Sequence, residues 1–177
     1  MNTTRQAVAR LFFALWPAPE VRDALAAIAR DLQAECGGRP TRADRIHLTL
    51  FFVGQVARER LVELESVAGE VHGTRFTLDF DRLAYFRRSR IAWVGAACPP
   101  PLAALEAQLR ARLAAYASPN DDRPYLPHVT LLRDAPRKPS KKDLPPVTWH
   151  AREFVLVESV MAAATSRYDI IGRWPLT

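Results

Sequence analysis

Apolar and polar residues follow one another along this chain in short blocks that predict strands and helices in turn. Strands are predicted where apolar, β-branched or aromatic residues run together or occupy every second position. Helices are predicted where apolar residues recur every third or fourth position. The predicted strands are 8–16, 46–53, 76–80, 83–86, 91–97, 126–132, 154–160 and 168–174, and the predicted helices are 19–36, 61–71 and 102–113.

The order of these elements repeats along the chain. A strand, a helix and a second strand that carries a histidine at its start occur once between residues 8 and 53 and again between residues 91 and 132. Strands joined by hairpins and covered by helices on one face form α+β folds. We therefore expect an α+β fold with two mainly antiparallel sheets, outer helices and a pseudo-twofold relation between the two parts.

Length and composition are those of an ordinary globular protein. The chain has 177 residues, of which 49% are hydrophobic and 25% charged, so residues 1–177 are expected to form a single domain, monomeric, with a core of its own. Cys36 and Cys98 lie far apart without the spacing of a zinc site or a disulfide framework. The first apolar run ends at Pro17, too short for a signal-peptide core or a membrane span, so we expect a soluble cytoplasmic protein.

The charge balance favours an anionic partner. Lysine and arginine together number 25 against 19 acidic residues, which gives a net charge of +6. Nearly all the cations are arginines, and the planar guanidinium group suits phosphate and can stack on bases. A general compositional preference for arginine explains the same numbers equally well.

Two tetrapeptides carry the chemistry. Residues 47–50 read His-Leu-Thr-Leu and residues 128–131 read His-Val-Thr-Leu, each at the same place in its copy of the repeated order. Side chains alternate faces along a strand, so each histidine projects beside its threonine while the apolar residues face the core. If the two parts pack face to face, the two pairs line opposite walls of one cleft.

Two imidazoles in one cleft suit the cleavage of a phosphodiester. An imidazole titrates near neutral pH, so one ring can accept a proton while the other donates one. Water activated by one histidine can open a 2′,3′-cyclic phosphate while the other protonates the departing ribose oxygen, with no metal or other cofactor required. Thr49 and Thr130 would donate hydrogen bonds to the non-bridging oxygens, where charge builds up in the transition state.

A structural role is the competing interpretation of these residues. A single histidine on a half-buried strand is more often a packed side chain than a catalyst, and threonine is common in strands in any case. Two matched sites in a repeated framework favour the catalytic interpretation. His72 and His150 have no threonine partner and are assigned no role, and the motifs of zinc hydrolases, serine esterases, P-loop proteins and dinucleotide enzymes are absent from the sequence.

These motifs resemble those of the two-histidine phosphoesterase superfamily, and within it the RNA 2′,3′-cyclic phosphodiesterases, or 2′-5′ RNA ligase-like proteins. The similarity spans nearly the whole chain. The segments that carry it are 10–15, 47–50, 89–95, 127–134 and 173–176.

The resemblance implies a bilobal fold with a central groove that hydrolyses terminal 2′,3′-cyclic phosphates of RNA to 2′-phosphates and weakly catalyses the reverse ligation. By the same resemblance His47 is the proton donor, His128 is the proton acceptor and Arg133 binds the terminal nucleotide. Phe13 is expected to stack on the base, although the sequence does not decide whether Phe12 or Phe13 faces the groove.

The expected partners are RNA ends or cyclic nucleotides, and no membrane. Two alternatives remain open at the level of the sequence. One is an RNA-binding module without catalysis, in which the histidines only hold phosphate. The other is 2′-5′ ligation as the main direction, which would use the same residues.

Overall fold

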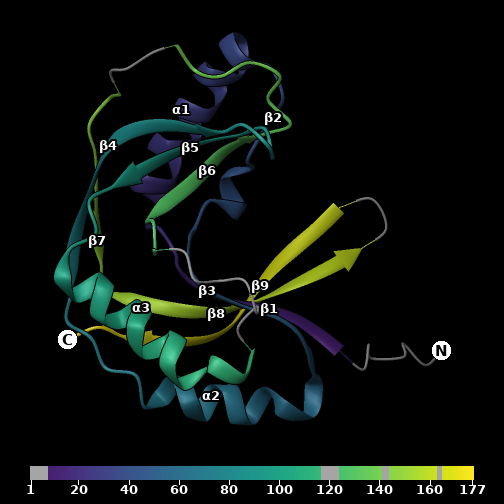
Figure 1. Cartoon of the computed structure of the whole chain (residues 1–177), viewed down its shortest axis with the longest axis vertical. Helices are drawn as coiled ribbons and strands as arrows, with labels where there is room; N and C mark the ends of the chain where they lie inside the picture. Colours follow the sequence, from purple (N-terminus) through teal and green to yellow (C-terminus); the bar gives the residue numbers. More distant parts are fainter. Residues whose placement is uncertain (1–7, 117–123, 141–143, 163–164) are drawn as a thin grey trace.

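The computed structural model describes residues 8–116, 124–140, 144–162 and 165–177. Three α-helices lie outside the strands (Figure 1). They are α1 (Pro19–Cys36), α2 (Leu61–Gly69) and α3 (Pro100–Arg112). The strands are β1 (Val8–Leu15), β2 (Arg39–Pro40), β3 (Leu48–Ala57), β4 (Phe76–Phe86), β5 (Ile91–Ala96), β6 (His128–Arg133), β7 (Val147–Ala151), β8 (Glu153–Ala162) and β9 (Thr165–Pro175).

The strands form one continuous antiparallel sheet with two lobes. Its order is β7-β4-β5-β6-β3-β1-β8-β9, with β2 beside β6. In Figure 1 the strands from β7 to β6 form the upper lobe and those from β3 to β9 the lower lobe. The lobes join where Leu48 of β3 pairs with Val129 of β6. The predicted α+β fold is confirmed, and the two predicted sheets are the two lobes of this continuous sheet.

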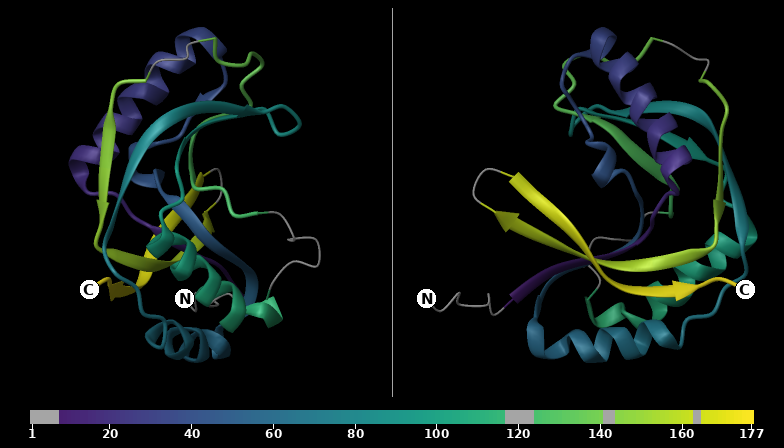
Figure 2. Two further views of the ribbon diagram at one scale, coloured as in Figure 1. Left: turned by 60° about the vertical axis from the view of Figure 1, so that its left-hand side comes forward. Right: turned by 180° about the vertical axis from the view of Figure 1, so that it is seen from behind.

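Each helix of the repeated order packs on the lobe opposite to the strands that it connects. Helix α1 connects β1 to β3 of the lower lobe, yet it contacts β2, β6 and β7 of the upper lobe. Helix α3 connects β5 to β6 of the upper lobe and contacts β3 below, beside α2 (Figures 1 and 2). The helices cover the outer faces of the sheet, so the inner faces of the two lobes are turned toward each other.

Helix α1 begins and ends where its sequence predicts, and the ends of α2 and α3 lie within two residues of the predicted ranges. Pro19 lies in the first turn of α1, where its missing N–H is not needed, and Gly37 ends the helix with a φ of 70°. Leu102, Leu105 and Leu109 recur on one face of α3 and are fully buried. Burial of each such side chain stabilises the fold by about 1.5–3 kcal/mol.

Three predictions about the strands need correction. The strands predicted at 76–80 and 83–86 are one strand, β4, with a register shift between Phe80 and Arg82 that breaks the alternation. Strand β3 does not end at Gly54 but continues to Ala57, because Gly54 adopts a φ of 86° at a second irregularity. Strand β7 was not predicted. The turn 87–90 between β4 and β5, which contains three arginines, is exposed.

The segment 134–146, which lies between β6 and β7, contains no helix or strand in its described parts. Residues 141–143 lie outside the described residues. Ala135 is fully buried, and Tyr85 donates a hydrogen bond to its carbonyl oxygen at 2.6 Å. The beginning of the segment is therefore anchored to β4.

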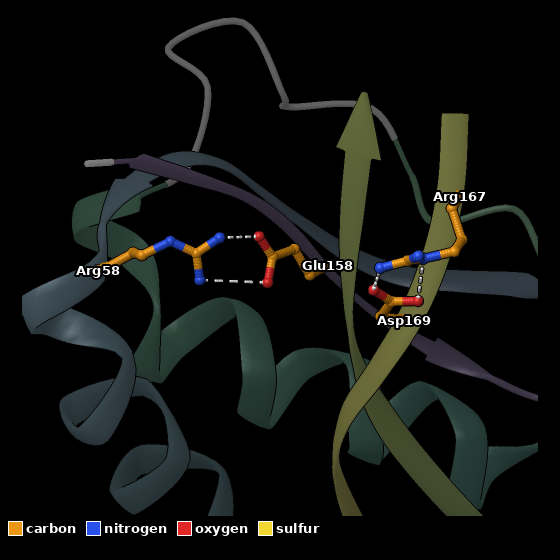
Figure 3. Close-up of polar contacts among 4 residues, drawn as sticks. All are labelled: Arg58, Glu158, Arg167 and Asp169. Carbon is orange, nitrogen blue, oxygen red and sulfur yellow. Dashed lines mark hydrogen bonds and ion pairs between the residues drawn. The ribbon is translucent and has the colours of Figure 1, made fainter. Parts of the chain in front are cut away.

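Two ion pairs brace the β8–β9 hairpin on its helix-covered side (Figure 3). Glu158 of β8 lies directly opposite Asp169 of β9, so two carboxylates face each other across the ladder. Arg58, beyond the end of β3, binds both oxygens of Glu158, and Arg167 binds both oxygens of Asp169. The Glu158 side chain is 11% exposed and the Asp169 side chain 37%. The first pair is thus shielded from water and the second is not.

This difference predicts unequal effects of neutralising the two carboxylates. Glu158→Gln removes the carboxylate that binds Arg58 through both of its oxygens in a site shielded from water, and should lower the free energy of unfolding by about 2–3 kcal/mol. Asp169→Asn breaks an exposed pair and should cost at most about 1 kcal/mol. Chemical denaturation of the two variants measures both values, and equal losses would contradict the assigned difference in burial.

Candidate active site

The pairing of β3 with β6 brings the two histidine motifs together. Leu48 lies opposite Val129 in an antiparallel ladder, so in the flanking positions each histidine stands opposite the threonine of the other motif. All four side chains project on the same face, because they flank the paired residues on either side. They line one cavity of about 600 Å³ between the lobes, together with Arg133. These five predicted site residues are His47, Thr49, His128, Thr130 and Arg133.

Both imidazoles are held in the same way by the backbone. The Nδ1 atom of His47 lies 2.6 Å from the carbonyl oxygen of Arg45, and that of His128 lies 2.8 Å from the carbonyl oxygen of Leu126. A carbonyl oxygen can only accept, so Nδ1 carries the proton in each ring. The atom that gains or loses a proton is therefore Nε2, in both histidines.

Aromatic rings enclose His47. Trp16 stacks on the imidazole at 5.6 Å with an interplanar angle of 10°, and Phe12 lies 4.9 Å away. Tyr168 of β9 meets the ring edge to face at 5.5 Å. Such contacts fix the orientation of the imidazole and exclude water from it.

His128 has an aromatic surrounding of its own. Phe86 and Trp93 each lie 5.5 Å from its ring, both in edge-to-face arrangements. The residue opposite His128 on β5 is Gly95, where a Cβ atom would lie 2.7 Å from the Trp93 ring. The glycine therefore leaves the space that Trp93 occupies beside the histidine.

The surroundings of His47 have an electrostatic consequence. Burial lowers the pKa of His47 from 6.5 to about 4, because the apolar rings disfavour the charged form. The hydrogen bond to the Arg45 carbonyl opposes this shift, while the positive charge of Arg133 and the neighbouring His128 add to it. In the absence of an anion, His47 is neutral at pH 7.

The cavity is strongly cationic. It is lined by the arginines Arg10, Arg39, Arg42, Arg45 and Arg133. Arg39 forms an ion pair with Asp134, and Arg42 with Asp44. The other three form no ion pair within the part of the chain that the structure describes. Their charges favour an anionic ligand such as a phosphate.

One predicted site residue lies elsewhere. Phe13 is fully buried in the core, where its ring packs against Phe154 and Trp174, so the prediction that it faces the groove is wrong. Phe12, on the opposite face of β1, is the residue turned toward the site. Its ring is only 4% exposed and contacts His47.

Apart from Phe12, which the sequence left as an alternative to Phe13, the aromatic residues around the histidines were not predicted. Trp16, just beyond the end of β1, follows Phe12 at an even spacing, which is a signal in the sequence once the inner face of the strand is known. Tyr168 comes from the far end of the chain and has no such signal.

Neither a metal site nor a membrane span is found in the part of the chain that is described. No group of three or more histidine, cysteine, aspartate or glutamate side chains is arranged to hold a metal ion among those residues. No helix among them is long and apolar enough to cross a membrane. Both described cysteines are free thiols.

Comparison with known proteins identifies a matching family model and a relative similar over nearly the whole chain. The family model of the 2′-5′ RNA ligase superfamily matches residues 14–160. The RNA 2′,3′-cyclic phosphodiesterase of Escherichia coli is 36% identical over 173 residues, which cover 95% of this chain and 97% of the relative.

Solved structures show the same similarity. The crystal structure of E. coli LigT in its apo form matches with a TM-score of 0.81 at 36% identity, over 97% of this chain and 99% of LigT. LigT in complex with 3′-AMP matches with a TM-score of 0.80 at 35% identity, over 96% and 99% of the two chains. With both histidine motifs meeting in one cationic cavity and the family model spanning both of them, this chain belongs to the 2′-5′ RNA ligase superfamily of two-histidine phosphoesterases.

Proposed function

We propose that this protein is an RNA 2′,3′-cyclic phosphodiesterase that converts cyclic phosphate ends to 2′-phosphates without a metal ion. The observation that carries the proposal is the arrangement of two histidines, each opposite the threonine of the other motif, in one cationic cavity. The relatives named above with the same activity support it.

The proposed reaction is the addition of water across one phosphate ester bond. His128 accepts a proton at Nε2 from the water as its oxygen bonds to phosphorus. The bond between phosphorus and O3′ breaks, and His47 donates the proton on its Nε2 to the departing O3′. The product carries a 2′-phosphate and a free 3′-hydroxyl, and at the end of the step His128 has gained one proton and His47 has lost one.

Hydrogen-bond donors hold the phosphate during this step. Thr49 and Thr130 donate to its non-bridging oxygens, whose negative charge increases as water attacks. Arg133 at the end of β6 binds the terminal nucleotide. Its exposure, its lack of an acidic partner among the described residues and its position on the cavity wall support this role.

The donor role of His47 requires a change on substrate binding. The free protein holds this ring neutral at pH 7, because burial lowers its pKa to about 4. A phosphate anion beside Nε2 favours the protonated ring and raises that pKa. The substrate itself therefore brings His47 into the form that can donate a proton.

The proposed partners are RNA ends and cyclic nucleotides. The related LigT has been crystallised with 3′-AMP and with ATP, which supports nucleotide binding in the corresponding cavity here. We further propose that the chain acts as a monomer, that residues 1–177 form one domain, and that it works in the cytoplasm. The free thiols suit a reducing compartment.

Removal of either histidine tests the proposal directly. His47→Ala and His128→Ala should each lower kcat on a 2′,3′-cyclic nucleotide by about 10²–10⁴-fold, because each removes a general acid or base. His150→Ala, which alters an exposed histidine that forms a hydrogen bond with Thr77, is the matched control and should retain activity. EDTA should leave the rate unchanged. Binding of RNA ends by the unaltered protein without turnover would instead favour the non-catalytic alternative.

The pH dependence of kcat/KM tests the pairing of the two histidines. One ring must be neutral and the other protonated, so activity should rise with pH, reach a maximum and fall again. Rates over a broad pH range with a cyclic mononucleotide provide the measurement. A profile with a single rising limb would mean that only one titrating group takes part.

NMR titration tests the proposed protonation of His47. Saturation with 2′-AMP, the product of the proposed reaction, should raise the pKa of His47 from about 4 by more than one unit. Imidazole chemical shifts with and without ligand report this directly, and the exposed His72 and His150 serve as internal controls. An unchanged pKa under saturating ligand would exclude His47 as the donor and favour it as the acceptor.

A further inference from the structure

We propose that Phe52 and Arg10, on the lower-lobe rim of the cavity, bind the nucleotide that precedes the cyclic phosphate end of the RNA. Phe52 would stack on its base, and Arg10 would contact the phosphate that links it to the terminal nucleotide. This inference rests on the proposed function and adds a second nucleotide site to it.

An irregularity in β3 brings Phe52 to the cavity. Phe13 of β1 pairs with Phe51, but the next residue of β1 pairs with Thr49, so β3 contains one extra residue between these pairs. Such a bulge reverses the alternation of side chains beyond it. Phe51 is consequently buried in the core at 3% exposure, while Phe52 shares the cavity with Thr49 and is 50% exposed.

Phe52 lies too far from the histidines to contact the cyclic phosphate, but close enough to contact the neighbouring nucleotide of the RNA. It is three residues along β3 from Thr49, at most about 10 Å. The opposite, upper-lobe wall of the cavity contains Arg133, which the proposed function assigns to the terminal nucleotide. If the terminal nucleotide occupies that wall, the RNA strand that continues toward its 5′ end leaves the histidines along the lower-lobe rim.

The chemistry of the rim suits single-stranded RNA. The guanidinium group of Arg10 lies 5.2 Å from the centre of the Phe52 ring, and Arg10 has no acidic partner among the described residues. An aromatic face for a base beside a cation for the backbone is the combination that binds single strands without sequence preference.

Other residues complete the rim without competing for this role. Ser159 and Met161 of β8 line the same end of the cavity, and the Met161 side chain is 66% exposed. Neither carries a charge, and of the arginines that line the cavity it is Arg10 that lies over the Phe52 ring. We therefore expect affinity for the preceding nucleotide to depend on stacking and on one phosphate contact.

A comparison of two substrates tests the site. Loss of one stacked base corresponds to roughly 5- to 150-fold in affinity, so Phe52→Ala should lower the ratio of kcat/KM for a cyclic-ended dinucleotide to that for a cyclic mononucleotide by about tenfold. The fall should appear in KM, and Phe52→Trp should restore the ratio because it keeps an aromatic face. An equal fall for both substrates, or no fall for either, would overturn the inference.

A dinucleotide that lacks only the base of its first nucleotide locates the contact. With the unaltered protein, removal of this base should weaken kcat/KM about as much as Phe52→Ala does. In the Phe52→Ala variant the same removal should have little further effect, because the two groups contact each other. If removal of the base lowers kcat/KM by the same factor in the variant as in the unaltered protein, Phe52 does not stack on this base, and that result would overturn the inference.

Arg10→Gln tests the phosphate contact. It should raise KM for the dinucleotide more than for the mononucleotide and reduce the slope of log affinity against log salt by about one. Arg30→Gln, which alters an exposed arginine of α1 away from the cavity, is the matched control. An unchanged salt slope in Arg10→Gln would remove the phosphate contact from the proposal.

The outcomes separate this inference from the proposed function. Turnover of the cyclic mononucleotide by the unaltered protein depends only on the histidine site. If that turnover is absent, the proposed function fails and the inference fails with it. If that turnover is present while Phe52→Ala leaves the ratio of the two kcat/KM values unchanged, only the second nucleotide site is refuted.

Discussion

The short pairing between β3 and β6 is the constraint on which the site depends. It joins two lobes of sheet at Leu48 and Val129, and the histidines and threonines flank these two residues. In an antiparallel ladder a shift of one residue turns every side chain to the other face. The same shift would bury both histidines and expose the apolar residues between them and their threonines. The burial of Leu48 and Val129, both fully inaccessible, therefore holds the proposed catalytic groups in register.

So short a junction needs support from elsewhere in the fold. The helices provide it, because α1 and α3 each connect strands of one lobe while packing on the other. A change in the angle between the lobes would move both helices off the lobe against which their buried leucines pack. Tyr125 adds a direct link, since its hydroxyl donates to the carbonyl oxygen of Thr49 at 2.9 Å and it lies three residues before His128. The two histidine motifs are thus tied together outside their own ladder.

Much of the fold and the centre of the site could be predicted from the sequence, for one physical reason. Repeated His-x-Thr patterns on strands specify which side chains share a face, and the structure adds only that the two faces meet. The same reasoning failed where the alternation is interrupted. Gly54 sits within a strand rather than at its end, and Phe12 rather than Phe13 is turned to the site. Periodicity tells which residues lie together, but bulges and the choice of inner face depend on partners distant in the sequence.

The aromatic surroundings of His47 present an apparent conflict with its proposed donor role, and the charge of the substrate resolves it. A buried imidazolium beside Arg133 and His128 would be unstable in the empty cavity, and the lowered pKa reflects that cost. The arginines that disfavour a proton on His47 also attract a phosphate anion. Once bound, the anion offsets their charge and accepts a hydrogen bond from the protonated ring. Positive charge in this cavity therefore keeps His47 neutral when no substrate is present and recruits the group that allows it to become an acid.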